Sequence, residues 1–157
     1  MGTYAWLLAL HVTGAFLLFS GGVIAGALTL FARRVQRPSE IALLLGLIRI
    51  AVVPIVLGAV MTLVLGLWLV HHAGYSYGTF WVWAAIVLWV IGNVVGSRGG
   101  RKQDEVRRLA VRLAAEGDAP SDELRARLRD PAENAMSWGA GLAIFLVLVL
   151  MIWKPGS

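Results

Sequence analysis

The sequence contains no cysteine, and only 15% of its 157 residues carry a charge. Without cysteine there are no disulfides, no thiolate metal sites, no iron–sulfur clusters and no covalently attached haem. A soluble domain carries about 25% charged residues, whereas 59% of this chain is hydrophobic and its mean hydropathy is +0.76. The composition therefore excludes a disordered chain and argues against a soluble globular domain.

Acidic residues are also absent from four long apolar segments, which cover residues 4–31, 41–70, 80–97 and 134–153. Their one formal charge is Arg49. A helix needs about 20 apolar residues to cross a bilayer, and it pairs its own backbone groups in lipid. The first segment is too long for the apolar core of a signal peptide, and no basic residue precedes it, so we expect it to be retained. These segments predict an all-α fold, a four-helix transmembrane bundle that forms a single integral membrane domain over residues 1–157.

Basic residues are missing from the second connection, residues 71–79, and concentrate in the first and third. Lys and Arg favour the cytoplasmic side of a membrane. We therefore predict that both termini lie outside, in a multi-pass protein of the cell inner (plasma) membrane. This placement accounts for the net charge of +5, so no nucleic-acid partner is expected. The aromatic residues predicted at the outer interface are Tyr4, Trp6, Trp68, Tyr75, Tyr77, Trp81, Trp83 and Trp153.

The third connection, residues 98–133, is the only sizeable polar region, with nine basic and eight acidic residues. Apolar spacing predicts a helix over residues 101–116. Ser121 is placed to cap a short second helix. Asp130 precedes a proline and is placed to cap the fourth spanning helix, with Glu133 completing a capping box. The connection is therefore predicted to be an amphipathic cytoplasmic helical hairpin at the membrane surface, or alternatively a docking site for a partner.

His11 lies about 10 Å inside the first apolar segment, counted from Tyr4 at the rise of a helix. An ionisable side chain at this depth indicates a functional site, and the alternative is a hydrogen bond to a neighbouring helix. At 100° per residue, small residues share its face and would admit another helix or a flat cofactor. They are Gly14, Ala15, Gly22, Ala25 and Thr29. We expect Gly22→Leu to disrupt this packing.

His71 and His72 end the second apolar segment on the same side of the membrane as His11. Imidazole ligates haem, copper and zinc. One hypothesis is a b-type haem held by His11 with His71 or His72, with Arg49 contacting a propionate. Another is a metal site that uses His11 and His71. The alternatives are interfacial histidines in contact with water, and an Arg49 that reaches the inner headgroups.

No carboxylate lies within the apolar segments, and neither a HExxH motif nor a P-loop is present. These absences argue against proton-coupled transporters, hydrolases and NTPases. The sequence favours a non-catalytic accessory or assembly subunit of a membrane complex. The alternatives are a b-type haem-binding redox protein that uses His11, and a copper or small-solute handling protein. The expected partners are the lipid bilayer and other membrane subunits or further copies of the chain.

The chain as a whole resembles a bacterial family of predicted integral membrane proteins of unknown function. The resemblance rests on LHVTGAFLL (10–18), RPSEIALLLGL (37–47), LGLWLV (65–70), RLAAEGD (112–118) and IWKP (152–155). The first helix alone is also similar to two membrane families, the copper-resistance D proteins and the haem-binding bacterial protoporphyrinogen oxidase. That second resemblance implies a role in haem or metal handling for His11.

Overall fold

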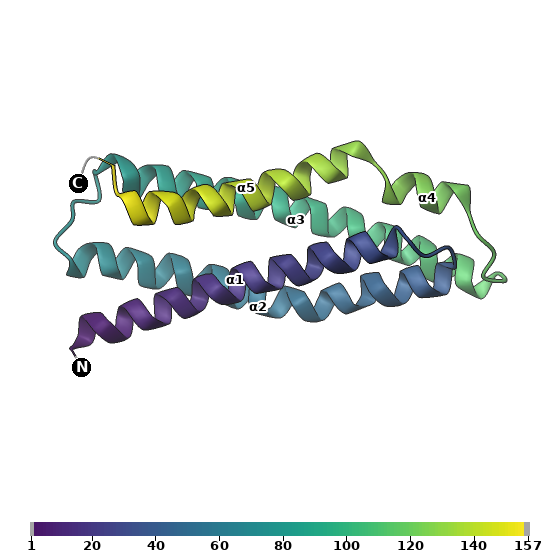
Figure 1. Cartoon of the computed structure of the whole chain (residues 1–157), viewed down its shortest axis with the longest axis horizontal. Helices are drawn as coiled ribbons and strands as arrows, with labels where there is room; N and C mark the ends of the chain where they lie inside the picture. Colours follow the sequence, from purple (N-terminus) through teal and green to yellow (C-terminus); the bar gives the residue numbers. More distant parts are fainter. Residues whose placement is uncertain (1, 156–157) are drawn as a thin grey trace.

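The computed structural model describes residues 2–155, which form helices joined by short connections (Figure 1). They are α1 (Thr3–Ala32), α2 (Pro38–His72), α3 (Phe80–Ala115), α4 (Asp122–Leu128) and α5 (Pro131–Trp153). Within this part of the chain, four helical stretches are long and apolar enough to cross a membrane. The predicted all-α transmembrane bundle is confirmed.

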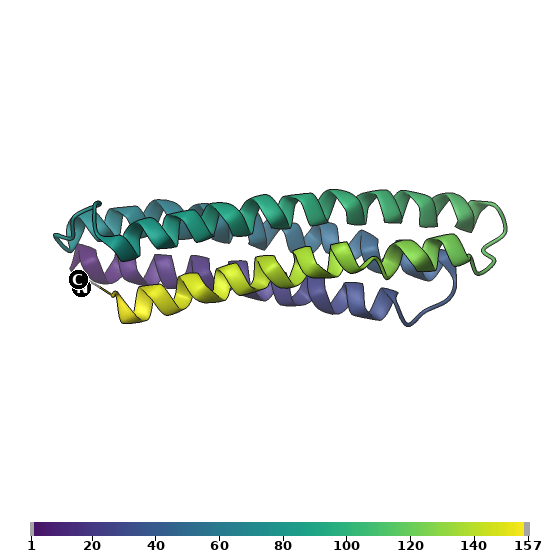
Figure 2. The ribbon, with the colours of Figure 1, turned by 90° about the horizontal axis from the view of Figure 1, so that it is seen from above.

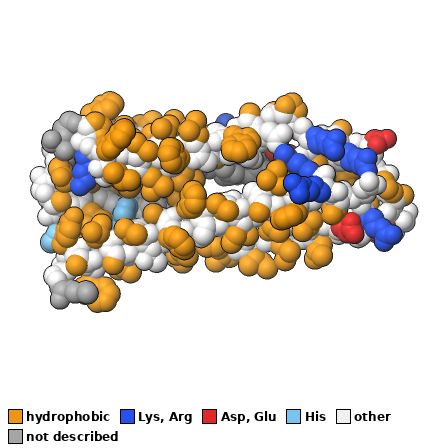
Figure 3. All heavy atoms as spheres, viewed as in Figure 1, with side chains coloured by type: hydrophobic (Ala, Val, Ile, Leu, Met, Phe, Trp, Pro, Cys, Tyr) orange, Lys and Arg blue, Asp and Glu red, His pale blue; other side chains and the backbone are white. Residues whose placement is uncertain are grey.

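The two ends of the bundle differ in composition. The N-terminal and C-terminal ends of the chain and the α2–α3 connection lie at one end, called the terminal end below (Figure 1). The α1–α2 and α3–α4 connections lie at the opposite end, called the basic end. Figure 3 shows hydrophobic side chains over most of the length and Lys and Arg side chains gathered towards the basic end.

The long helices pair as two hairpins. α1 packs along α2, α3 packs along α5, and α2 and α3 hold the two hairpins together (Figures 1 and 2). In contrast, α1 and α5 hardly touch each other. The bundle is therefore loosely closed on the side between α1 and α5.

Glycines bring α1 and α2 close together. A Cβ atom added at Gly14 would lie 2.7 Å from Cβ of Met61, and one added at Gly58 would lie 2.5 Å from the carbonyl oxygen of Gly14. One added at Gly21 would lie 3.0 Å from the carbonyl oxygen of Ala51. Only hydrogen fits at these positions, so the two backbones pack directly against each other.

Gly22 lies outside this contact. It is exposed, and a Cβ there would meet nothing within 4 Å, so the prediction that it belongs to the packing stripe was wrong. The buried positions of α1 include Leu7, His11, Gly14, Leu18 and Gly21. These positions are spaced by four and three residues in turn, an average of 3.5 residues per turn. The predicted stripe assumed 3.6 residues per turn, so it departs from the real contact line by about 20° for every seven residues. That drift separates Gly21, which packs, from Gly22, which does not.

The predicted hairpin takes a different form in the structure. Instead of ending near residue 97, α3 runs without a break through Gly99 and Gly100 to Ala115, for 36 residues in all. A glycine within a helix costs about 1 kcal/mol, and the continued burial of Val106 and Leu109 offsets that cost. The polar half of α3 therefore extends the bundle along its own axis (Figure 2).

A second core forms at the basic end. Leu124 and Leu128 of α4 are buried there against α1, α2 and α3, in a cluster that includes Ile41, Val106 and Leu109. This packing holds the connection against the bundle.

Two predicted caps are present. The hydroxyl of Ser121 accepts a hydrogen bond from the N–H of Leu124, and the carboxylate of Asp130 accepts one from the N–H of Ala132. The predicted capping box is incomplete, because Glu133 makes no side-chain hydrogen bond within residues 2–155 and is buried, with 4% of its surface exposed.

Candidate functional site

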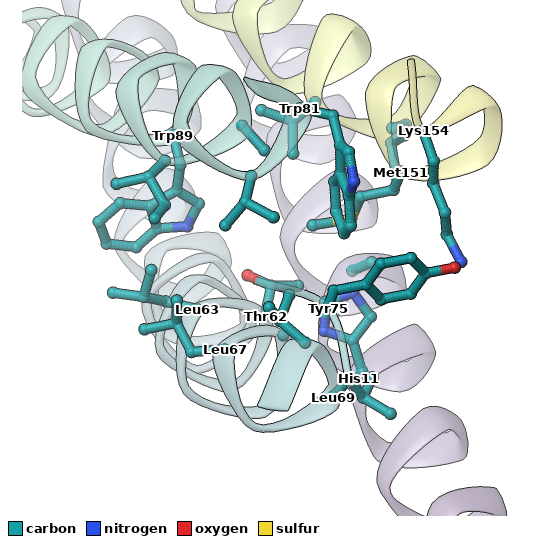
Figure 4. A pocket seen from close by; sticks show the side chains of 18 of the residues that line it. His11, Thr62, Leu63, Leu67, Leu69, Tyr75, Trp81, Trp89, Met151 and Lys154 are labelled. Atoms are coloured by element: carbon teal, nitrogen blue, oxygen red, sulfur yellow. The ribbon is translucent and has the colours of Figure 1, made fainter. Parts of the chain in front are cut away.

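A cavity of about 200 Å³ lies between the helices in the half of the bundle nearest the terminal end (Figure 4). Side chains from α1, α2, α3 and α5 line it, and most of them are aliphatic, such as Leu63, Leu67 and Leu148. Drug-sized ligands occupy pockets of about 300–1,000 Å³, whereas an apolar cavity of about 150 Å³ in another protein admits benzene. This cavity therefore has room for one ring system or a short stretch of chain.

His11 projects from α1 into this lining (Figure 4). The side chain is buried, with 8% of its surface exposed, and its Nδ1 atom has no hydrogen-bond partner within residues 2–155. Gly66 of α2 makes room for the ring, since a Cβ added there would lie 3.0 Å from Cε1 and 3.4 Å from Nδ1 of His11. The glycine thus lets the imidazole pack directly against α2, with Nδ1 on the side that faces that helix.

Two tryptophans of α3, Trp81 and Trp89, line the same cavity. Their indole Nε1 atoms are buried and, among the residues described, find no hydrogen-bond partner. Indole nitrogen can only donate a hydrogen bond, and an unpaired buried donor costs about 1–3 kcal/mol. Three residues of the lining, His11, Trp81 and Trp89, thus each carry a buried ring nitrogen that has no partner within residues 2–155.

The cavity is bounded at the terminal end by Tyr75 and Lys154 (Figure 4). The ring of Tyr75 packs edge-to-face on Trp81, with 5.6 Å between centroids. The ammonium of Lys154 lies 5.2 Å from the centre of the Tyr75 ring, which is the geometry of a cation–π contact. An aromatic ring and a cation thus lie between the cavity and the terminal end of the bundle.

His71 and His72 lie outside the cavity lining. Both are exposed at the end of α2. The ring of His71 stacks on Tyr77 at 6.4 Å, and that of His72 stacks on Tyr4 at 6.2 Å. The structure therefore does not bring either imidazole into the cavity that His11 lines.

Arg49 lies near the basic end of the bundle. Its guanidinium donates to the carboxylate of Asp104 on α3 at 2.9 Å. It precedes Gly66, which contacts His11, by 17 positions of the same helix, or about 25 Å at the rise of a helix. Arg49 and His11 consequently do not form a joint site for one small cofactor.

Metal ligands do not gather anywhere in the described part of the chain. No group of three or more His, Asp or Glu side chains there lies close enough to hold an ion. Of the two residues considered together as a metal pair from the sequence, His11 is buried in the cavity lining, whereas His71 is exposed and does not line the cavity.

Sequence reasoning missed the tryptophans as site residues. Trp81 is buried with 6% of its surface exposed, so its side chain faces the interior of the bundle, and Tyr75 also lines the cavity. Trp83, next to the cavity residue Val82, is 57% exposed and faces away from the bundle. The signal that was available is helical spacing, because Trp81, Ala85 and Trp89 follow one another at intervals of four residues.

These features define a class, that of a polytopic helical membrane protein with a small apolar cavity between its helices. The chain belongs to a particular family within it, described as predicted integral membrane protein (DUF2269), which matches residues 5–155. The family resemblance seen in the sequence is therefore confirmed. No curated protein and no solved structure matches the chain.

Proposed function

We propose that this protein is a non-catalytic membrane subunit that holds a small lipophilic molecule with hydrogen-bond acceptors in the cavity beside His11. The observation that supports it is that three residues lining one apolar cavity, His11, Trp81 and Trp89, each carry a buried ring nitrogen without a hydrogen-bond partner in the described part of the chain. Buried polar groups are nearly always paired in native proteins. A bound molecule that offers acceptor atoms to these ring nitrogens would give them hydrogen-bond partners, whereas the hydrocarbon tails of lipids have no acceptor to offer.

The lining supports binding better than catalysis. Its titratable side chains are Tyr4, His11, Tyr75 and Lys154, and none of them is a carboxylate. A general base needs a partner that orients it or a nucleophile within hydrogen-bond reach. Nδ1 of His11 has neither within residues 2–155. A role as an accessory subunit that carries a ligand for a larger membrane complex fits this arrangement.

Haem b is the alternative ligand, since an imidazole at membrane depth is a usual axial ligand. The cavity lining offers His11 but neither His71 nor His72, so a pair of imidazoles is not available there. The cavity volume of about 200 Å³ is also small for a macrocycle. The geometry thus favours a smaller, metal-free ring or chain.

The test is to purify the full chain from its native membrane in mild detergent and analyse what remains bound. Mass spectrometry of a solvent extract should reveal one acceptor-bearing lipophilic molecule, close to one per chain. His11→Phe keeps the ring but removes both nitrogens, and it should lower the occupancy at least fivefold. His72→Phe is the matched control, because His72 is exposed outside the cavity, and it should retain the molecule.

Absorption spectra of the same preparations decide between the alternatives. A Soret band with a sharp reduced α-band, lost in His11→Phe, would replace the proposal with the haem alternative. An extract that contains only membrane phospholipid, in equal amount for both variants, would overturn the proposal.

A further inference from the structure

Each of the four long helices carries an exposed tryptophan near the terminal end, together called the tryptophan belt below. They are Trp6 of α1, Trp68 of α2, Trp83 of α3 and Trp153 of α5. The helix ends that carry them lie together in both views of the ribbon (Figures 1 and 2). Tryptophan is enriched where a membrane protein meets the membrane–water interface. The belt therefore gives all four helices a common reference level.

From this belt the apolar surface runs to different lengths on the two hairpins. On α1 and α2 the exposed large apolar side chains farthest from the belt are Phe31 and Leu43. Each is 25 positions from the tryptophan of its helix, about 38 Å at the rise of a helix. On α3 the first charge is Arg98, and on α5 a second exposed tryptophan is Trp138. Each is 15 positions from the belt, about 22 Å.

The difference does not come from one hairpin sliding along the other. Near the basic end, Arg49 of α2 donates to Asp104 of α3 at 2.9 Å. Gln103 of α3 donates to Thr29 of α1 at 2.8 Å. The polar half of α3 consequently lies beside the last turns of α1 and the first turns of α2. At one level of the bundle, one hairpin is charged and the other is apolar.

The additional apolar surface of α1 and α2 is called the apolar extension below. It consists of Leu30, Phe31, Leu43, Leu47 and Ile50, all of them exposed. On α2 its members follow at intervals of four and three residues, so they share one face of the helix. Figure 3 shows hydrophobic side chains along α1 and α2 that continue into the half of the molecule where Lys and Arg side chains gather. The extension is thus continuous with the apolar surface of the spanning segments.

A flat bilayer does not fit both hairpins. Its hydrocarbon layer is about 30 Å thick, which lies between the two apolar lengths. A single flat boundary would leave the apolar extension in water or place Arg98 in hydrocarbon. Tilting the bundle does not help, because two parallel boundaries cut every helix at the same length.

We propose that the apolar extension is a binding surface for anionic phospholipids of the leaflet at the basic end. Beside α1 and α2 this leaflet follows the protein about 15 Å farther than beside α3 and α5. Acyl chains cover the extension, and the bilayer is locally thicker there than beside the other hairpin. Local thickening and thinning are ordinary responses of a bilayer to helices of unequal apolar length.

The charge around the extension selects anionic headgroups. Residues 30–50 carry four arginines and one glutamate, and Arg49 is paired with Asp104. The guanidinium of Arg34 lies 6.0 Å from the centre of the Phe31 ring, at the border of the apolar extension. Clusters of basic residues at the edge of a spanning segment attract anionic lipids. Arg33, Arg34 and Arg37 are therefore placed to hold the phosphates of lipids whose tails cover the extension.

The same charges disfavour a second copy of the chain as the covering group. Two copies with one orientation in the membrane are related by an axis along the membrane normal. Each arginine of the border would then lie at the level of its own counterpart, and like charges that face each other oppose association.

Spin labels on single cysteines test where the leaflet ends, since the chain has no cysteine of its own. Ile50→Cys lies on the apolar extension, and Arg101→Cys lies one turn from Asp104 on the opposite hairpin; both positions are exposed. The full chain is inserted into vesicles of phosphatidylcholine with about a quarter phosphatidylglycerol. Electron paramagnetic resonance then compares collisions of each label with oxygen, which concentrates in hydrocarbon, and with a nickel chelate, which stays in water.

The label at Ile50→Cys should collide mainly with oxygen and that at Arg101→Cys mainly with the chelate, with ratios that differ at least fivefold. Leu43→Cys, on the same face as Ile50, gives a second reading if Ile50→Cys folds poorly. Equal ratios at the two levels would show a flat boundary and overturn the proposal. A label on the extension that meets neither reagent and is broadened by a second label would assign the surface to another copy of the chain.

Lipid retention tests the charge of the headgroup. Native mass spectrometry of the detergent-purified chain should show at least threefold more bound phosphatidylglycerol than phosphatidylcholine. The double substitution Arg34→Gln and Arg37→Gln should abolish this preference. Arg112→Gln with Arg129→Gln is the matched control, because both are exposed arginines at the same end outside the extension, and it should keep the preference. Equal retention of the two lipids, or equal effects of the two double substitutions, would overturn the anionic-lipid surface.

Discussion

Asp118, in the connection between α3 and α4, caps the start of α2 through Ser39. One carboxylate oxygen accepts from the backbone N–H of Ser39 and the other accepts from its hydroxyl, both at 2.7 Å. These hydrogen bonds lower the pKa of the Asp118 carboxyl, and Arg37 adds to the effect. The bond joins residues 79 positions apart, and both belong to the stretches that carry the family resemblance. Two stretches that are far apart in the sequence thus meet in one tertiary contact.

Removing this cap should loosen the α3–α4 connection. In Asp118→Ala the N–H of Ser39 loses its acceptor, because the first N–H groups of a helix have no partner within it. Hydrogen exchange followed by mass spectrometry should show faster exchange at the start of α2. The peptides that line the cavity serve as the internal control. We expect their exchange to be the same in both proteins, while exchange at the start of α2 becomes faster in Asp118→Ala. Unchanged exchange at Ser39 would contradict the capping role.

Asp104 should give the protein a stability that depends on acid pH. Hydrogen bonds from Arg49 and Arg107 lower its pKa from 3.8 to about 2, with a smaller contribution from Arg108. Because the folded pKa lies below the unfolded one, this stabilisation is present above about pH 4 and disappears as the pH falls towards 2. Asp104→Asn should cost about 1 kcal/mol at neutral pH.

Thermal unfolding of both proteins in detergent from pH 7 to pH 2 measures the effect. The difference in Tm should be constant near neutrality and shrink below pH 4. A difference that is the same at pH 3 and at pH 7 would show that the ion pairs of Asp104 with Arg49, Arg107 and Arg108 contribute nothing to stability.

The contact between α1 and α2 should be sensitive to a single methyl group. In Gly58→Ala the new Cβ would lie 2.5 Å from the carbonyl oxygen of Gly14. The helices must move apart, at a cost of about 1–3 kcal/mol or more. Gly22→Ala is the control, with nothing within 4 Å, and should change stability by less than about 0.5 kcal/mol. Equal thermal unfolding of the two variants would refute this packing.

The orientation in the membrane is a prediction from the basic residues of the first and third connections. The lack of cysteine makes it directly testable with Ser76→Cys and Ala119→Cys, both at exposed positions. A membrane-impermeant maleimide applied to intact cells should label Ser76→Cys, at the terminal end. Ala119→Cys should react only after the membrane is opened. The reverse pattern would place both termini in the cytoplasm.

The helices and caps could be predicted because their causes are local. Apolar length predicts a spanning helix, and Ser121 and Asp130 cap the helices that follow them. The break expected near residue 97 was wrong because burial of Val106 and Leu109 outweighs the local cost of Gly99 and Gly100. That burial depends on contacts with other helices, which the local sequence does not reveal.

In the candidate site, too, some features follow from the local sequence and others from contacts between helices. The sequence alone determined that an imidazole, that of His11, stands within an uninterrupted apolar segment long enough to span a membrane. Only the tertiary structure decided which side chains surround it. Helix rotation turned Trp81 inwards and Trp83 outwards, and the pairing of the hairpins left His71 and His72 exposed. Composition and length determine whether a helix enters the membrane, but packing between helices determines which face of it meets a ligand.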